Sequence, residues 1–86
     1  MAQMTMYTTS WCGFCRRLKS QLDREGIGYD EVDIERTPDA AKIVTEINGG
    51  NRTVPTVVYP DGSAATNPSF AEVKTALAKA EAAPGV

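Results

Sequence analysis

The sequence predicts a single α/β domain in which a four-strand mixed β-sheet is flanked by three helices. The first observation is the length, because a chain of 86 residues forms one domain with one modest core. The second is the order of the patterns, which read strand, helix, strand, helix, strand, strand, helix. The third is their connections: two helical crossovers and one tight turn require both parallel and antiparallel pairs of strands.

The first strand is expected over residues 3–9, where methionine, tyrosine and threonine suit a pleated surface. A helix then begins at residue 13 or 14 and ends at residue 25, before Gly26, a residue type that commonly follows a helix. Helical spacing places one apolar stripe toward the core. Its members are Phe14, Cys15, Leu18 and Leu22. The opposite positions, expected in water, are Arg16, Lys19, Gln21 and Asp23.

A second strand is expected over residues 28–34 and a second helix up to residue 47. This helix starts with a threonine N-cap, a proline in the first position and an acid in the first turn, at residues 37–39. Its predicted buried face consists of Ala40, Ile43, Val44 and Ile47. The run at 48–51 ends the helix, because its two glycines accept the left-handed conformation.

The last two strands are expected over residues 52–59, entered through Pro55, and over residues 63–66. The Asp-Gly pair at 61–62 is typical of a tight hairpin turn between them. The second of these strands is short, as edge strands often are.

Ser69 with Glu72 predicts a capping box at the start of the final helix, and Asn67 is the competing cap. The apolar stripe of that helix is Phe70, Val73, Ala76, Leu77 and Ala80. The domain is expected to cover residues 1–82, followed by a flexible tail over 83–86.

Composition excludes several classes of function. A net charge of −2 gives no electrostatic case for binding nucleic acid or an anionic membrane. The chain has no histidine and two cysteines, so it lacks a Cys-His hydrolase pair and cannot supply four zinc ligands from those residue types. No metal is therefore expected. No long apolar run or basic leader is found, and we expect a monomer in the cytosol, where thiols stay reduced.

Both cysteines lie in the stretch Trp11-Cys12-Gly13-Phe14-Cys15, at a strand-to-helix junction. This placement indicates redox chemistry. A structural disulfide is the weaker interpretation, because so short a loop gains little stability from closure. Cys12 precedes the helix and faces its unpaired N–H groups, which favour a thiolate. We therefore expect Cys12 to attack and Cys15, one turn further in, to act as the resolving thiol.

Two neighbouring features fit the same chemistry. Three basic residues lie near the start of the helix, where the helix dipole disfavours cations: Arg16, Arg17 and Lys19. A thiolate or an anionic substrate nearby would offset this unfavourable interaction. Arg16 is the candidate for stabilising the Cys12 thiolate, although a solvated basic face is the simpler alternative.

A cis bond before Pro55 would bring the Val54 backbone to the cysteine turn, where it could pair with a peptide-like thiol substrate. The alternative is an ordinary proline at a strand start.

The motifs Tyr7-Thr8-Thr9-Ser10-Trp11-Cys12-Gly13-Phe14-Cys15, Arg52-Thr53-Val54-Pro55 and Asp61-Gly62-Ser63 resemble the glutaredoxins over nearly the whole chain. The runs at 8–13, 29–35, 48–57 and 61–68 are similar to the mycothiol-dependent actinobacterial branch of that family, the mycoredoxins. This resemblance implies a thioredoxin fold, a cis-Pro55 and Cys12 as nucleophile on mycothiol–protein mixed disulfides. Mycothiol would recharge Cys12, and NADPH would act through mycothiol disulfide reductase, so no cofactor need bind.

The chain departs from ordinary glutaredoxins at two places. Those proteins usually carry Gly-Gly-Cys-Asp before the last helix, where this chain has Ala65-Thr66-Asn67-Pro68-Ser69, and a lysine where it has Thr8-Thr9-Ser10. Both departures favour mycothiol over glutathione. The residues expected to bind the substrate are Trp11, Phe14, Arg52, Thr53, Val54, Pro55 and Asn67.

Two other functions remain open from the sequence. One is a dithiol electron donor of the NrdH-redoxin type that is recharged by thioredoxin reductase. The other is a binding module in which two chains hold an iron–sulfur cluster through Cys12.

Overall fold

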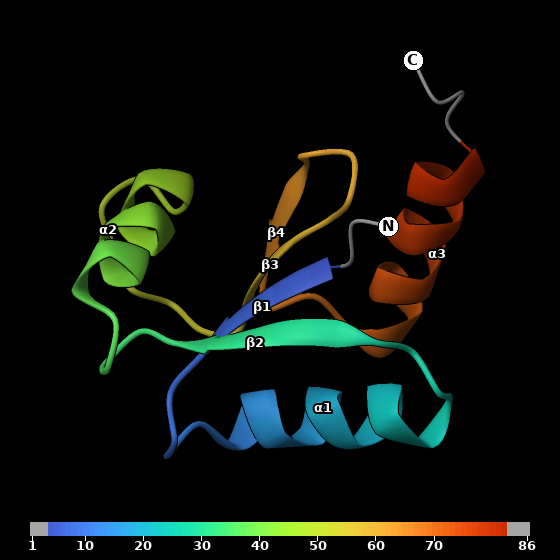
Figure 1. The fold of residues 1–86 in the computed structure, drawn as a ribbon, viewed down its shortest axis with the longest axis horizontal. Helices are drawn as coiled ribbons and strands as arrows, with labels where there is room; N and C mark the ends of the chain where they lie inside the picture. The colour runs from blue at the N-terminus through green and yellow to red at the C-terminus, as the bar shows by residue number, and fades with distance from the viewer. Residues whose placement is uncertain (1–3, 83–86) are drawn as a thin grey trace.

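The computed structural model describes residues 4–82, which form the predicted seven elements in the predicted order (Figure 1). These elements are β1 (Met4–Thr8), α1 (Gly13–Arg24), β2 (Tyr29–Asp33), α2 (Pro38–Ile47), β3 (Thr56–Val58), β4 (Ala64–Thr66) and α3 (Phe70–Ala82). The first residue of the predicted first strand and the predicted flexible tail at 83–86 lie outside the described residues. No helix within residues 4–82 has the length and apolar character needed to cross a membrane.

The sheet is mixed, with strand order β2-β1-β3-β4. β1 pairs with β2 in parallel and with β3 antiparallel, and β4 is the antiparallel edge strand next to β3. Helix α2 covers one face of the sheet, and α1 and α3 cover the other (Figure 1). The carboxyl ends of the parallel strands β1 and β2 therefore lie at the same edge as the start of α1.

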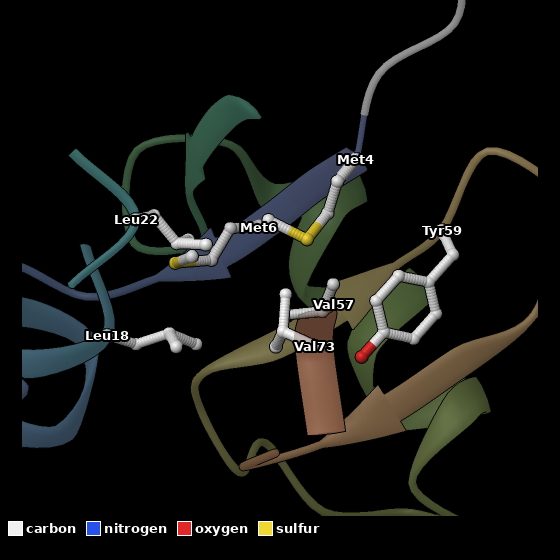
Figure 2. Packing of buried hydrophobic residues seen from close by; sticks show 7 residues of the cluster. All are labelled: Met4, Met6, Leu18, Leu22, Val57, Tyr59 and Val73. Atoms are coloured by element: carbon white, nitrogen blue, oxygen red, sulfur yellow. The ribbon is translucent and has the colours of Figure 1, made fainter. Parts of the chain in front are cut away.

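The main core lies between the sheet and the pair α1 and α3. Side chains from β1, α1, α3 and the β3 segment converge there (Figure 2). They are Met4, Met6, Leu18, Leu22, Val57, Tyr59 and Val73. A second, smaller cluster packs α2 against the other face with Ile34, Ala40, Ala41 and Val44. Because α1 packs on β1 through its own apolar stripe, the helix start is fixed beside the end of that strand.

Two predicted core residues are exposed. Phe14 is 66% exposed and Ile43 is 41% exposed. The buried stripe of α1 runs through Cys15, Leu18 and Leu22, and Phe14 lies at the flank of that stripe in the first turn. In α2 the buried residues are Ala40, Ala41 and Val44, so Ala41 is buried in the core and Ile43 is not. Helical spacing alone allows these apolar residues at the flanks to be buried or exposed. The packing of each helix against the sheet decides which of them are buried.

Other details of the prediction also differ from the structure. Thr37 precedes α2 as expected, but its side chain makes no capping hydrogen bond. The predicted strand over 52–59 is regular only over Thr56–Val58, because the preceding residues form a loop that is held by side chains. The tight turn between β3 and β4 is confirmed: Gly62 has a φ of 92° and its N–H donates to the Tyr59 carbonyl at 2.9 Å.

The predicted capping box opens α3. The Ser69 N–H donates to Glu72 Oε1 at 2.9 Å, and the Glu72 N–H donates to Ser69 Oγ at 3.1 Å. Asn67, the competing cap, instead adopts a left-handed φ of 47°. The Ser69–Glu72 pair therefore determines where α3 starts.

Replacing Ser69 by alanine is expected to lower the free energy of unfolding by about 0.5–2 kcal/mol, because the Glu72 N–H at the helix start loses the Ser69 hydroxyl that accepts its hydrogen bond. Chemical denaturation measures this loss. Thr75→Ala, at an exposed position of the same helix, is the matched control and should change stability by less than about 0.5 kcal/mol. Equal losses in the two variants would show that the box is not what stabilises the start of α3.

Candidate active site

Cys12 is the N-cap residue of α1. Its backbone is extended, with φ −81° and ψ 111°, and its N–H donates to the Thr9 carbonyl at 3.3 Å, which turns the chain from β1 into the helix. The Cys12 Sγ accepts a hydrogen bond from the Cys15 N–H at 3.1 Å. The sulfur of Cys12 therefore occupies the place where a helix start binds negative charge.

Cys15 has a different environment. Both cysteines are free thiols, but Cys15 is fully buried, whereas Cys12 retains 5% exposure. Burial, followed by the hydrogen bond with Cys12, raises the pKa of the Cys15 thiol to about 12. Cys15 is consequently a protonated thiol at neutral pH, and the two cysteines are chemically unequal.

The segment before β3 approaches the cysteine turn, as predicted. The Val54–Pro55 peptide bond is cis. The Cys12 thiol donates to the Val54 carbonyl with a sulfur-to-oxygen distance of 3.7 Å, across 42 positions of the sequence. This contact brings the backbone of Val54 to the sulfur of Cys12.

Asn48 holds that segment in place and was not identified from the sequence. Its Nδ2 donates to the Thr53 carbonyl at 3.3 Å and to Thr56 Oγ1 at 3.0 Å. The Thr66 hydroxyl donates to Asn48 Oδ1. One amide therefore joins the end of α2 to the loop, to β3 and to β4. The sequence places Asn48 in a helix-ending run with two glycines, and that pattern gives no sign of the long-range contacts.

Of the other predicted binding residues, Asn67 contacts this segment, and Trp11 and Phe14 lie within two positions of Cys12. The backbone N–H of Asn67 donates to the Pro55 carbonyl at 2.7 Å, which sets the start of α3 beside the cis-proline. Trp11 and Phe14, the neighbours of Cys12 in sequence, are 67% and 66% exposed. Arg52 and Thr53 are also exposed.

A polar groove of about 350 Å³ runs between α1 and the beginning of α3, lined by Phe14, Arg17 and Asn67 among others. It lies on the α3 side of the cysteine turn. Six of the seven predicted binding residues have their side chains exposed or half-buried, and Pro55 is the buried one.

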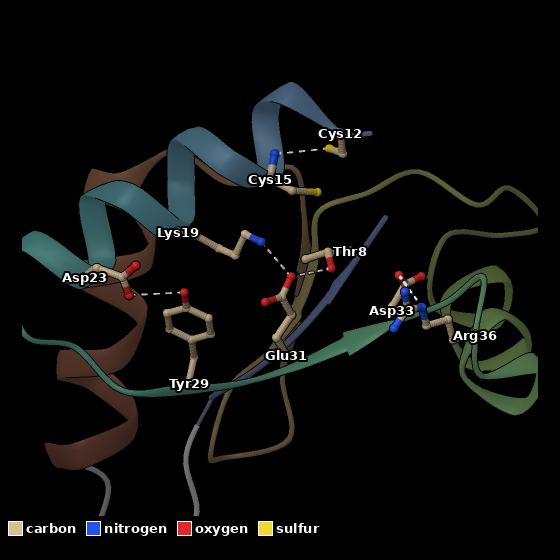
Figure 3. A network of polar contacts seen from close by, with 9 residues as sticks. All are labelled: Thr8, Cys12, Cys15, Lys19, Asp23, Tyr29, Glu31, Asp33 and Arg36. Carbon is tan, nitrogen blue, oxygen red and sulfur yellow. Dashed lines mark hydrogen bonds and ion pairs between the residues drawn. The ribbon is translucent and has the colours of Figure 1, made fainter. Parts of the chain in front are cut away.

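The basic residues of α1 differ in their surroundings. Arg16 is exposed, and its backbone N–H donates to the Cys12 carbonyl at 3.1 Å. Lys19, predicted to face water, is half-buried and pairs with Glu31 Oε2 at 2.8 Å. Figure 3 shows this pair below α1, between the helix and strand β2.

Comparisons with known proteins agree with this geometry. A family model described as glutaredoxin matches residues 4–63. The chain is 60% identical to a protein assigned to the glutaredoxins in Mycobacterium tuberculosis, covering 91% of this chain and 93% of that protein. It is 48% identical to mycoredoxin 1 of Corynebacterium glutamicum, covering 95% of this chain and 98% of the relative. The crystal structure of a glutaredoxin from Archaeoglobus fulgidus superimposes with a TM-score of 0.72 at 28% identity, covering 87% of this chain and 85% of that one.

Proposed function

Because the chain belongs to the glutaredoxin family of thiol-disulfide oxidoreductases, we propose that it reduces mycothiol–protein mixed disulfides by nucleophilic attack of Cys12. One observation carries the proposal: the Cys12 sulfur accepts the Cys15 N–H at the start of α1. Hydrogen bonds of this kind stabilise a thiolate, which is the nucleophilic form. The similarity to a relative named mycoredoxin 1 supports mycothiol as the thiol, as do the departures from ordinary glutaredoxins at 8–10 and 65–69.

The first step transfers mycothiol to the enzyme. The Cys12 thiolate attacks the mycothiol sulfur of the mixed disulfide, and a new bond forms between these two sulfurs. The bond to the substrate protein breaks, and that protein leaves as a thiolate and takes up a proton from water. In the second step a free mycothiol thiolate attacks the bound mycothiol sulfur. Mycothiol disulfide is released and the Cys12 thiolate is restored.

Electrons enter from outside the chain. Mycothiol disulfide reductase with NADPH returns mycothiol disulfide to the thiol, so the chain itself needs no bound cofactor. A second route remains available, in which Cys15 attacks Cys12, expels mycothiol and closes an internal disulfide that mycothiol later reopens. Both routes need mycothiol in its reduced form, which requires a compartment where thiols stay reduced. The proposal therefore places the protein in the cytosol. We also propose that it works as a monomer.

The binding residues divide by chemistry. The Val54 backbone lies next to the Cys12 sulfur and is the proposed strand partner for the cysteinyl part of mycothiol. The exposed rings of Trp11 and Phe14 offer an apolar surface to the substrate protein. Arg52, Thr53 and Asn67 are the proposed polar contacts around cis-Pro55, and Arg16 is the proposed cation for the Cys12 thiolate.

Replacing Cys15 by serine tests the monothiol route. The variant is expected to keep turnover on a mycothiol mixed disulfide, because neither step of that route uses the Cys15 thiol. The release of mycothiol from a mycothiolated protein, followed with NADPH and mycothiol disulfide reductase, measures it, with Cys12→Ser as the inactive reference. Complete loss of turnover in Cys15→Ser would establish a dithiol route, as an NrdH-type donor requires.

A further inference from the structure

A polar network lies directly below the cysteine turn and has no part in the reaction described above. Lys19 follows Cys15 by one helical turn, so the two side chains share a face of α1. Lys19 Nζ lies 2.8 Å from Glu31 Oε2, and Thr8 Oγ1 donates to the same oxygen at 2.8 Å. Figure 3 shows that the network bridges α1, β1 and β2 and lies on the side of α1 that faces the sheet, below Cys15.

The charges of Cys15 and of the Lys19–Glu31 network come from two elements. Helix α1 presents Lys19, with Cys12 at its N-cap, and strand β2 presents Glu31, which pairs with Lys19, and Asp33, which acts on Glu31. The uncharged Thr8 ends β1, and Thr9 follows it. Burial and Cys12 raise the pKa of Cys15, whereas the Thr9 backbone and the charge of Lys19 lower it. In turn, the hydrogen bond from Lys19 lowers the pKa of Glu31, so the carboxylate that pairs with Lys19 is ionised at neutral pH.

We propose that Lys19 and Glu31 set the rate at which Cys15 closes the internal disulfide: Lys19 stabilises the Cys15 thiolate as it forms, and Glu31 restrains that effect by pairing with Lys19. In the closure step the Cys15 proton passes to water and the Cys15 sulfur bonds to the Cys12 sulfur. The bond between Cys12 and its bound thiol breaks, and that thiol leaves with the electron pair. Lys19 and Glu31 act through Cys15 and are therefore positioning residues.

The two members of the ion pair are expected to act in opposite directions. Lys19→Met removes the cation, so the pKa of Cys15 rises and fewer molecules carry the thiolate. Glu31→Gln leaves Lys19 uncompensated, so the pKa of Cys15 falls, while the glutamine oxygen can still accept from Thr8. A purely structural ion pair would behave differently, because both substitutions break the same contact and would shift the reaction the same way.

A two-phase thiol assay isolates the closure step. Reduced protein is mixed with the neutral reagent 2,2′-dipyridyl disulfide in a stopped-flow instrument between about pH 7 and 9. Attack by Cys12 releases the first thiopyridone, and closure by Cys15 releases the second. The first phase is the internal reference, and Cys15→Ser, which lacks the second phase, identifies it. The use of dipyridyl disulfide keeps this test independent of mycothiol, since the inference rests on the proposed roles of the two cysteines and not on the choice of co-substrate.

Lys19→Met is expected to slow the second phase and Glu31→Gln to accelerate it, by about threefold for each unit of pKa. The thiolate fraction changes tenfold per unit, and the opposite change in nucleophilicity offsets about half of that. Asp23→Asn is the matched control, because it weakens another contact between α1 and β2, the 3.2 Å hydrogen bond from the Tyr29 hydroxyl, and should leave closure unchanged. Closure rates that fall together in both variants, or change in neither, would overturn the proposal.

Discussion

Replacing Cys12 by serine is expected to lower kcat/KM for a mycothiol mixed disulfide by at least about 10³-fold, which corresponds to about 4 kcal/mol of transition-state stabilisation. The chain has two cysteines, so the variant keeps only Cys15. That thiol is fully buried and its pKa is raised to about 12. It therefore offers the substrate neither an accessible sulfur nor an appreciable thiolate fraction at neutral pH.

The fold should survive this substitution, which makes the loss of activity interpretable. Cys12 is the N-cap of α1, and serine is among the preferred residues at that position because its hydroxyl accepts from the helix N–H groups. The melting temperature of Cys12→Ser should therefore equal or exceed that of the parent protein. Substantial turnover in a folded Cys12→Ser variant would assign the nucleophile elsewhere.

Leu22→Ala is expected to produce the largest loss of stability, about 2–5 kcal/mol. Leu22 is fully buried in the main core, where α1 packs on β1, and the truncated side chain leaves a cavity that the sheet cannot close. A domain of this size has a total stability of only about 4–13 kcal/mol. The variant should therefore lose a large part of its free energy of unfolding, and denaturant unfolding followed by circular dichroism quantifies the loss.

Ser20→Ala provides the matched control for Leu22→Ala. Ser20 lies in the same helix but is exposed, so its replacement should change the free energy of unfolding by less than about 0.5 kcal/mol. If Leu22→Ala were as stable as Ser20→Ala, the packing of α1 on the sheet would not be what holds the cysteine turn beside β1.

The element order could be predicted from the sequence because hydrophobic period, turn residues and caps are local signals. Gly26, the Asp-Gly turn and the Ser69–Glu72 box each act within a few residues, and each lies where it was expected. The cysteine turn was also predictable, since Cys12 and Cys15 are separated by one helical turn at a strand end. The approach of Val54 to Cys12 followed from the order of the strands.

The errors concern contacts that no local pattern encodes. Phe14 and Ile43 satisfy the helical period but lie outside the buried stripes, because the sheet surface covers only part of each helix. The local sequence around Asn48 predicts only the end of a helix, although the Asn48 amide joins α2 to β3 and β4. The pairing of Lys19 with Glu31 depends on the parallel register of β1 and β2, which brings a carboxylate from another strand beneath the helix.

The most direct test of mycothiol-dependent catalysis by Cys12 is turnover of a mycothiolated protein with NADPH in three parallel systems. These contain mycothiol with mycothiol disulfide reductase, glutathione with glutathione reductase, or thioredoxin reductase alone. We predict sustained turnover with mycothiol and little with the other two, for both the parent protein and Cys15→Ser. Efficient reduction by thioredoxin reductase, with no response to mycothiol and no turnover in Cys15→Ser, would contradict this prediction and identify the chain as a dithiol electron donor.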